Sequence, residues 1–485
     1  MLRIGLAAPF RGLLTASPAT AAELKIEALV YDPLVSIDPA TLAPDEARSL
    51  AQSVRESNRG TTWTYRLRSF VRFSDGTPVR GADVARSLRR AVLPSRPISI
   101  TAPDANTVVV RLRAPDSAFA TLTVPIASVA MLGSGPYRIA RAATGTLELG
   151  RNARTWLPIS GPDRIVFRTS ATREAQLRDL LAGSLDALEI GPRESTVLAP
   201  SPAITLVERP SLASLRLDFE DTSVPVTIRR ALTNGIDRNA IVARVFDGHG
   251  LVARSVIPAG YVGWFRAPKA QAAFDRSAAT SLLESEGWQL GTGRVRVLGD
   301  RRASFRLATD GSTAARLAAR LVVADARALG IEIVPVARDD PAARARLALL
   351  AGATSPQSLL QPLARGNRAI SRLLAGARHA GQTAAIANAY AGVQDRAAGE
   401  NRTLPLAEPT TITAVSDRRW EEPAGAVGLL DVGSSRGVVG LVPAREPGPG
   451  WRTWLLIAAV SLAAFGAAFG PALRARGEPI ERASA

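Results

Sequence analysis

Residues 63–92 constrain the fold of this 485-residue chain more than any other stretch. Trp63, Tyr65 and Leu67 alternate with polar or charged residues, which is the pattern of a β-strand with one buried face. A second short apolar run follows at 70–73. These two runs predict two consecutive strands at the start of an α/β unit.

The turn and the helix that follow are marked by specific residues. Residues 74–78 read Ser-Asp-Gly-Thr-Pro, in which the aspartate caps its own backbone, the glycine accepts positive φ and the proline fixes the exit. A helix is expected to begin beside Asp83, which would serve as its N-cap or as a first-turn acid. Val84, Leu88 and Val92 then share one face of this helix.

Together these residues closely resemble the signature of family 5 of the extracellular solute-binding proteins, the oligopeptide-, dipeptide- and nickel-binding components of ABC importers. That signature runs through two short strands, an Asp-Gly-x-Pro turn and a helix that begins near an Asp-Val pair. The matching residues here are Trp63, Tyr65, Leu67, Arg68, Val71, Phe73, Asp75, Gly76, Pro78, Val79, Asp83, Val84 and Ser87. An unrelated hairpin followed by a helix is the alternative.

Further segments resemble the family in the same order along the chain, from about residue 2 to residue 420. The clearest are the sequence around Tyr31 (23–34), Gly-Ser-Gly-Pro-Tyr-Arg-Ile (133–139), the paired helices at 228–241, Ser-Val-Ile-Pro-Ala-Gly (255–260) and Leu-Gly-Ile-Glu-Ile (329–333). So many matches in one order favour the family over a chance hairpin.

Local patterns lead to further expectations. Residues 2–8 suit a first strand, whereas Arg11 interrupts the apolar run and leaves it short for a signal peptide. Residues 40–57 are expected to form a helix and a loop, and 314–328 a long amphipathic helix. Asp237 is expected to cap a helix rather than to act in catalysis.

The resemblance implies an α/β (α+β) type II periplasmic-binding-protein fold with two lobes and an extra subdomain. The first lobe would comprise residues 1–212, with the subdomain at about 36–132. The second lobe would comprise 213–405, and the chain would return to the first lobe at 406–425.

The C-terminal region has a different character. Residues 426–452 are rich in proline and glycine and are expected to form a tether. Residues 453–473 carry no charge, and as a helix they would span about 31 Å, the thickness of a bilayer core. We therefore expect one transmembrane helix in the lipid bilayer, followed by a short tail at 474–485; a buried core helix is the alternative. The chain has no cysteine, so a lipidated cysteine cannot serve as the anchor.

The net charge of +17 comes almost entirely from arginine, since the chain has only two lysines, Lys25 and Lys269. A basic chain can indicate a nucleic-acid or anionic-membrane partner. The arginines are spread through every segment without a basic block, which favours a high-GC genome that encodes arginine in place of lysine. We expect no nucleic-acid partner.

No group of residues in the sequence supports catalysis. The two histidines, His249 and His379, have no metal-ligand spacing and cysteine is absent, so no metal site is expected. Residues 433–437 fit the Gly-x-Ser-x-Gly pattern of serine hydrolases, but both histidines precede the serine, opposite to the order in that fold. We expect a protein that has no catalytic residues, is not an enzyme and carries no cofactor.

The resemblance implies that a ligand binds in a cleft between the two lobes. The candidate ligand contacts are Tyr31, Gly135, Tyr137, Thr354 and Ser355. Packing is the alternative role of the first three. Peptide carriers of this family supply an Asp, in a Trp-x-x-Asp-Tyr type of segment, that pairs with the ligand's α-amino group. The corresponding residues 349–360 have neither Trp nor Asp, so a peptide ammonium would lose a charge-assisted hydrogen bond worth about 1.5–3 kcal/mol.

Two functional hypotheses follow. In the first, the protein captures a peptide-like or other small solute for the permease subunits of an ABC importer, anchored in the cell membrane with its large domain outside the cytoplasm. In the second, a degenerate binding domain acts as a membrane-tethered sensor or assembly scaffold, which the altered 349–360 segment and the lack of a clear export signal favour. No sequence pattern identifies the ligand, the membrane orientation or the oligomeric state.

Overall fold

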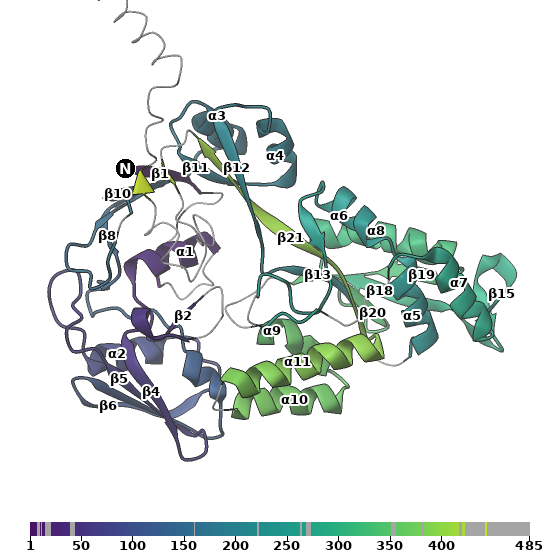
Figure 1. Cartoon of the computed structure of the whole chain (residues 1–485), viewed down its shortest axis with the longest axis horizontal. Helices are drawn as coiled ribbons and strands as arrows, with labels where there is room; N and C mark the ends of the chain where they lie inside the picture. Colours follow the sequence, from purple (N-terminus) through teal and green to yellow (C-terminus); the bar gives the residue numbers. More distant parts are fainter. Residues whose placement is uncertain are drawn as a thin grey trace, which may run out of the picture. The chain divides into compact units, whose positions relative to one another are not determined.

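Figure 1 shows the computed structural model of the whole chain. The structure describes residues 1–6, 10, 12–14, 21–38, 44–159, 161–220, 223–261, 264–267, 273–350, 356–380, 383–416, 420–421 and 442–443. The chain divides into two compact units, Met1–Val442 and Pro443–Ala485. The sheets and helices that surround the candidate site all belong to the first unit.

One mixed sheet of 12 strands runs through the described part of this unit. Its strand order is β19-β18-β20-β13-β21-β11-β1-β10-β9-β8, and β12 and β14 pair with β21 beside this path. The strands are β1 (Leu2–Gly5), β8 (Tyr137–Ala143), β9 (Thr146–Arg151), β10 (Arg164–Arg168), β11 (Ala187–Ile190), β12 (Ile204–Pro210), β13 (Ser214–Phe219), β14 (Gly250–Val252), β18 (Ser304–Thr309), β19 (Glu332–Val336), β20 (Ala345–Leu350) and β21 (Thr403–Ser416). The expected first strand is present as β1, which runs parallel to β10 and β11.

Strand β21 joins the two halves of this sheet (Figure 1). It is 14 residues long, beyond the usual range of about 3–10. From Thr403 to Ala407 it pairs antiparallel with β13, and from Thr410 to Ser416 it pairs antiparallel with β12. A single continuous strand therefore belongs to both halves.

The half of the sheet that contains β13, β18, β19 and β20 packs its apolar side against helices. These are α5 (Val226–Gly235), α6 (Arg238–Val245), α7 (Arg276–Ser285) and α8 (Thr313–Ala328). The other half carries α1 (Ala21–Val30), α3 (Arg173–Leu181) and α4 (Pro192–Leu198). The amphipathic helix expected at 314–328 is confirmed as α8. Asp237 caps α6 as expected, because its Oδ1 accepts the N–H of Ala240 at 2.9 Å.

A separate antiparallel sheet of four strands, in the order β4-β5-β7-β6, packs with helix α2. These elements are β4 (Ala51–Ser57), β5 (Thr62–Leu67), α2 (Gly81–Arg90), β6 (Pro97–Asp104) and β7 (Thr107–Leu112). As predicted, Trp63, Tyr65 and Leu67 are buried on β5, and Asp83 lies in the first turn of α2.

Two local predictions for this region are wrong. Residues 40–57 were expected to contain a helix and a loop, but their last seven residues form β4, which pairs with β5 along its length. Pairing with a neighbouring strand overrides a weak local pattern here. Residues 70–73 form no second strand and make one isolated bridge, between Arg72 and Pro78. The Asp-Gly turn folds this segment back on itself, so it pairs within its own hairpin.

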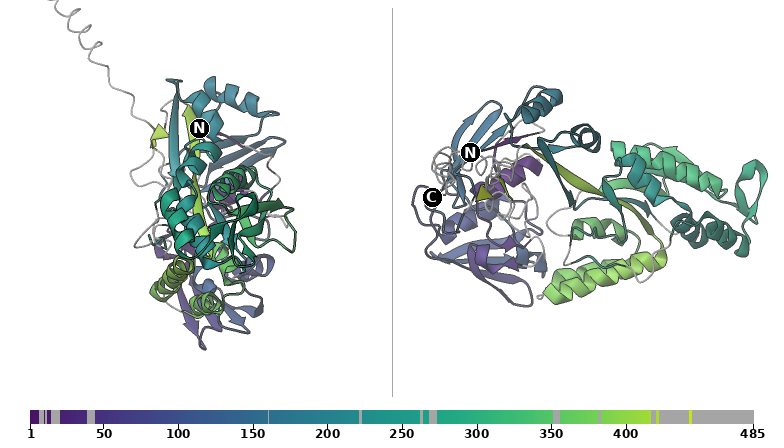
Figure 2. Two further views of the ribbon diagram at one scale, coloured as in Figure 1. Left: turned by 90° about the vertical axis from the view of Figure 1, so that its right-hand side faces the viewer. Right: turned by 45° about the horizontal axis from the view of Figure 1, so that its top comes forward.

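Helices α9 (Gln357–Leu360), α10 (Arg368–His379) and α11 (Thr383–Glu400) come between β20 and β21 in the chain, and α10 and α11 lie side by side (Figure 1, Figure 2). Their buried residues belong to the same apolar core as the four-stranded sheet. The Ser117 hydroxyl, in the 3₁₀ helix η2 (Ser117–Thr121), donates to the carbonyl of Ala377 in α10. Helices from the stretch predicted as the second lobe thus share a core with the extra subdomain.

The remaining elements are short. They are β2 (Ser36–Ile37), β3 (Pro44–Asp45), β15 (Gln289–Leu290), β16 (Arg296–Leu298), β17 (Arg301–Arg302), β22 (Trp420–Glu421), β23 (Val442–Pro443) and the 3₁₀ helices η1 (Glu46–Arg48), η3 (Thr292–Arg294) and η4 (Gln361–Ala364). No helix among the described residues is both long and apolar enough to cross a bilayer. The predicted tether at 426–452, transmembrane helix at 453–473 and tail at 474–485 lie outside the described residues, apart from Val442 and Pro443.

Candidate functional site

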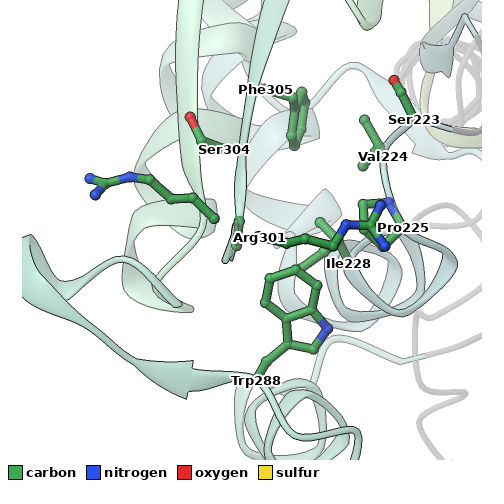
Figure 3. A pocket seen from close by; sticks show the side chains of 10 residues that line it. Ser223, Val224, Pro225, Ile228, Trp288, Arg301, Ser304 and Phe305 are labelled. Carbon is green, nitrogen blue, oxygen red and sulfur yellow. The ribbon is translucent and has the colours of Figure 1, made fainter. Parts of the chain in front are cut away.

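Two cavities differ strongly in size. One, of about 60 Å³, lies at the start of α5, with Ser223, Trp288 and Phe305 among its lining residues (Figure 3). That volume holds a few water molecules and is far below the roughly 300–1,000 Å³ of small-molecule sites. The other, of about 520 Å³, is an open groove lined by residues of α10 and α11. Of the predicted ligand contacts that the structure describes, Tyr31, Gly135 and Tyr137, none lines either cavity.

Two of the predicted contacts are buried tyrosines. The Tyr31 side chain is 2% exposed, and its hydroxyl donates to the carbonyl of Met131 at 2.9 Å. Burial, reinforced by the charge of Glu27, raises the pKa of Tyr31 to about 12. Tyr137 is fully buried, which raises its pKa as well, and its hydroxyl donates to the carbonyl of Pro162 at 2.7 Å. Both hydroxyls are already used inside the protein.

The third predicted contact, Gly135, lies where the chain passes the C-terminal end of α1. Its N–H donates to the carbonyl of Val30 at 3.0 Å, and a Cβ at this position would lie 2.7 Å from the Val30 carbonyl carbon. Gly133 is tighter still, since a Cβ there would come within 1.8 Å of the Val30 oxygen. Backbone packing therefore requires both glycines. Thr354 and Ser355 lie outside the described residues, and all five residues stay predictions as ligand contacts.

A buried carboxylate that the sequence patterns did not single out connects the family-like segments 23–34 and 133–139 with Trp156. Asp32 is 3% exposed, and its Oδ2 accepts hydrogen bonds from Ser134 Oγ and Trp156 Nε1, both at 2.8 Å. Burial raises the pKa of Asp32, and these two hydrogen bonds oppose the rise. The Asn152 amide donates to the carbonyl of Gly135 at 2.8 Å. This Asp32 cluster (Asp32, Ser134, Asn152 and Trp156) fixes the loops around α1.

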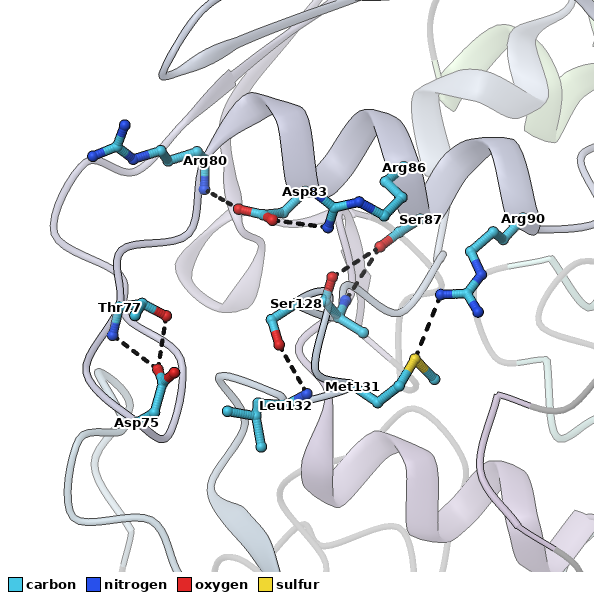
Figure 4. A network of polar contacts seen from close by, with 11 residues as sticks. Asp75, Thr77, Arg80, Asp83, Arg86, Ser87, Arg90, Ser128, Met131 and Leu132 are labelled. Atoms are coloured by element: carbon cyan, nitrogen blue, oxygen red, sulfur yellow. Dashed lines mark hydrogen bonds and ion pairs between the residues drawn. The ribbon is translucent and has the colours of Figure 1, made fainter.

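The acidic residues of the 63–92 motif also serve the fold (Figure 4). Asp75 accepts from the hydroxyl and the N–H of Thr77, at 2.7 and 2.9 Å, and these bonds lower its pKa. Asp83 accepts from the N–H of Arg80 and pairs with Arg86, both at 3.0 Å. The first carboxylate closes the turn and the second stabilises the start of α2, so the motif builds the subdomain.

A serine, a histidine and a glutamate meet beside β21. Ser195 Oγ lies 2.7 Å from His249 Nε2, and His249 Nδ1 lies 3.1 Å from Glu208 Oε2. This order of contacts is that of a hydrolase triad. However, Ser195 is 1% exposed and its hydroxyl donates to the carbonyl of Pro192 at 2.6 Å, so the proton that a nucleophilic serine would give to His249 is already engaged. We interpret the trio as a structural link between α4, β12 and the residue that precedes β14.

The trio could not be found in the sequence because its members are 41 and 54 residues apart and follow no motif. The Gly-x-Ser-x-Gly pattern at 433–437 lies outside the described residues. Within the part of the chain that the structure describes, no group of three or more acidic or histidine side chains is placed to hold a metal ion.

Glu408 is a further buried titratable group on β21. Its side chain is 2% exposed, and its Oε2 accepts the N–H of Ala259 at 2.9 Å. Burial raises the pKa of Glu408 to about 7, although backbone hydrogen bonds from Ala259 and Arg254 oppose the shift. This carboxylate holds the family-like segment 255–260 against the strand that joins the two halves of the sheet.

The class of protein follows from comparison with known sequences. A sequence model described as bacterial extracellular solute-binding proteins, family 5 (middle region), matches residues 47–353, which is more than half of the chain. The chain belongs to family 5 of the bacterial extracellular solute-binding proteins. Members of this family bind solutes and are not enzymes.

Curated relatives are moderately similar to this chain. Protein XP55 of Streptomyces lividans is 28% identical over 348 residues, which covers 63% of this chain and 61% of the relative. The glutathione-binding protein GsiB of Escherichia coli strain K12 is 28% identical over 241 residues, which covers 43% of this chain and 47% of GsiB. The matches thus span about half to three-fifths of the relatives' own length.

Solved structures show the same fold. An ABC transporter substrate-binding protein from Sinorhizobium meliloti superposes with a TM-score of 0.78 at 19% identity, covering 92% of this chain and 100% of that chain. The oligopeptide-binding protein AppA of Bacillus subtilis, in complex with a nonapeptide, superposes with a TM-score of 0.62 at 18% identity, covering 92% and 99%. The predicted mixed α/β periplasmic-binding-protein fold is therefore confirmed.

Proposed function

We propose that this protein captures a peptide-like or other small solute between two lobes and presents it to the permease subunits of an ABC importer. The observation that carries the proposal is the fold match over the full length of a solved ABC transporter substrate-binding protein. Strand β21, which belongs to both halves of the main sheet, suits two lobes that close over a ligand. The nonapeptide bound by AppA and the name of GsiB support a peptide-like solute.

Thermal unfolding of the full-length chain with candidate solutes tests this function. The panel contains dipeptides, tripeptides including glutathione, sugars and metal chelates. A solute present at about 100 times its Kd adds about 2.7 kcal/mol to the free energy of unfolding, which is a shift of a few degrees in Tm. If no solute class raises the Tm, the protein does not act as an importer's binding component.

We also propose that residues 453–473 form one transmembrane helix that tethers the large domain on the outer side of the cell membrane. The segment is uncharged, with Trp451 and Trp454 near one end and Arg474 beyond the other. The test is alkaline extraction of membranes that contain either the full-length chain or a Leu462→Arg, Phe465→Arg variant. The unaltered chain should stay with the membranes and the variant should be released. Release of both chains would reject the tether.

A degenerate binding domain that acts as a membrane-tethered sensor or scaffold is the second candidate function. It is favoured by the internal hydrogen bonds of the Tyr31 and Tyr137 hydroxyls, and by the absence of Trp and Asp from 349–360. The two experiments above separate the candidates. A scaffold should stay with the membranes while its Tm is unchanged by every solute class.

A further inference from the structure

Strand β13 carries a polar row on one of its faces. Leu215 and Leu217 belong to the apolar core of their half of the sheet. Because side chains alternate along a strand, Ser214, Arg216 and Asp218 lie on the opposite face. Arg216 nevertheless has 0% of its surface exposed, so this face is covered as well.

The Arg216 guanidinium is only partly satisfied by the protein. Its Nε donates to Asp218 Oδ2 at 2.9 Å. Its Nη1 and Nη2 are shielded from solvent and have no hydrogen-bond partner among the described residues, and the same is true of the Ser214 hydroxyl. A charged group taken out of water requires hydrogen-bond partners for its polar atoms. These three donor atoms therefore lack an acceptor that the described part of the chain could supply.

Arg296 shows that the fold can satisfy a buried arginine completely. It is 3% exposed, and it donates to the carbonyls of Leu329 and Trp288 at 2.9 and 2.7 Å and to Glu284 at 3.1 Å. Arg229 of α5 also has donors without a partner in the described part. What distinguishes Arg216 is its position in the sheet.

Arg216 lies near the end of β20, the strand that precedes the predicted ligand contacts of the second lobe in the sequence. In the sheet, Ser214 pairs with Leu350 of β20, and Arg216 pairs with Pro405 of β21. Leu350 is directly followed by 351–355, which contain both predicted ligand contacts of the second lobe. The polar row of β13 therefore begins opposite the last residue of β20.

We propose that Arg216 and Ser214 bind the carboxylate of an acidic solute. Nη1 and Nη2 donate to the two carboxylate oxygens, and Ser214 Oγ donates to one of them. The planar guanidinium matches a carboxylate in shape and in number of donors. Asp218 occupies Nε and leaves the Nη edge for the ligand. The inference rests on the proposed solute-binding function and specifies the class of solute.

In residues 349–360 the sequence differs from the pattern of the family's peptide carriers, and this difference agrees with the assignment. Residues 349–360 lack the acidic residue that would pair with a peptide's α-amino group. A site with a buried guanidinium and no acidic residue in 349–360 recognises the acidic end of its ligand. Peptides with a free C-terminus and simple organic acids share that group, and the experiment below distinguishes them.

Calorimetric titration of the full-length chain tests the assignment. The probes are di- and tripeptides with a free C-terminus, including glutathione, the same peptides as C-terminal amides, and succinate and citrate as non-peptide acids. The acids should bind, and a C-terminal amide should bind at least about tenfold more weakly than its acid. If only the peptides bind, the carboxylate is that of a peptide C-terminus. If succinate and citrate bind as well, the site accepts the carboxylate of a simple organic acid.

Three variants locate the carboxylate. Arg216→Met should weaken acid binding by about tenfold to a hundredfold, and Ser214→Ala by a smaller factor of about three to ten. Arg346→Met is the matched control, because Arg346 pairs with Asp218 across the sheet but donates to Glu220 at 3.0 Å. Its affinity should stay within about threefold of the unaltered chain.

The thermal midpoint of the free chain provides a second measurement. Arg216→Met removes a buried charge whose two Nη groups lack partners in the described part of the chain, so it should maintain or raise the Tm of the unliganded chain. A lower Tm together with unchanged acid affinity would show a structural role and overturn the assignment. Equal binding of acid and amide would also overturn it while leaving solute capture intact. Absence of binding by every probe and every solute class would overturn both proposals.

Discussion

The Asp32 cluster and the strands that pair with β21 both bury charged groups. The two regions differ in how far the hydrogen-bonding capacity of these groups is satisfied. Asp32 accepts from two side chains within the cluster and serves only the packing of loops around α1. Where β21 joins the two halves of the sheet, Glu408 has a pKa near neutrality, and the Nη groups of Arg216 have no partner in the described part of the chain. The Asp32 cluster is thus architecture, whereas the incompletely satisfied groups lie where the two halves of the sheet join.

This difference suits a solute-binding protein, which needs a rigid framework and a separate region that responds to a ligand. Fully hydrogen-bonded polar networks make a region rigid. Groups whose protonation or hydrogen bonding is incomplete can respond to a ligand or to pH. Variants in the two regions should therefore behave differently. Changes near α1 should affect stability alone, whereas changes where the two halves of the sheet join should affect binding or pH dependence.

The largest expected effect is that of Gly133→Ala. The added Cβ would overlap the backbone oxygen of Val30, which cannot move without displacing α1, so we expect a loss of roughly 4 kcal/mol or more in unfolding free energy. Urea denaturation measures it. Gly376→Ala in α10 is the control, because no atom lies within 4 Å of its Cβ position, and it should be neutral or stabilising by up to about 1 kcal/mol. An unchanged unfolding free energy for Gly133→Ala would show that the loops around α1 are not tightly packed.

The next effect is that of Asp32→Ala. It leaves the buried donors of Ser134 and Trp156 without an acceptor, which should cost about 3 kcal/mol of unfolding free energy. Asp75→Ala, which changes an exposed turn, should cost no more than about 1 kcal/mol. The affinity for any solute found by titration should be unchanged in both variants. Weaker solute binding by Asp32→Ala would contradict a purely architectural role for the cluster.

Glu408 should make stability depend on pH. Its pKa is about 7 in the folded protein and 4.5 without the fold, so the folded state binds more protons between these values. Its contribution is therefore fully present below about pH 4.5 and is lost as the pH rises through about 7, an effect of about 3 kcal/mol.

The measurement compares urea denaturation at about pH 5 and about pH 8 for the unaltered chain and for Glu408→Gln. The unaltered chain should lose more stability than the variant on going to the higher pH. Equal losses would show that Glu408 does not titrate in this range.

The smallest expected effect is that of Ser195→Ala. Removing the hydroxyl deletes its contact with His249 Nε2 and should cost about 1 kcal/mol in urea denaturation. Hydrolysis of a test ester by the purified chain should be absent before and after the change. An esterase activity that disappears in Ser195→Ala would overturn the structural interpretation of this trio.

Local and family-level features could be predicted from the sequence because they depend on neighbouring residues. The alternation of Trp63, Tyr65 and Leu67 defines β5, and Asp237 caps α6, since strand pattern and capping act over a few residues. The segment that became β4 was predicted wrongly, because its conformation depends on pairing with β5 rather than on its own weak pattern.

By itself, the sequence determined the class of protein, through motifs of the solute-binding family that recur in order along the chain. Only the tertiary structure decided what individual side chains do. Tyr31 and Tyr137 are buried donors, and Ser195 contacts His249 although 54 residues separate them. That the Nη groups of Arg216 have no partner among the described residues likewise becomes visible only when β20 and β21 flank β13. The burial of a side chain and its hydrogen-bond partners depend on residues that are distant in the sequence, so no local pattern can predict them.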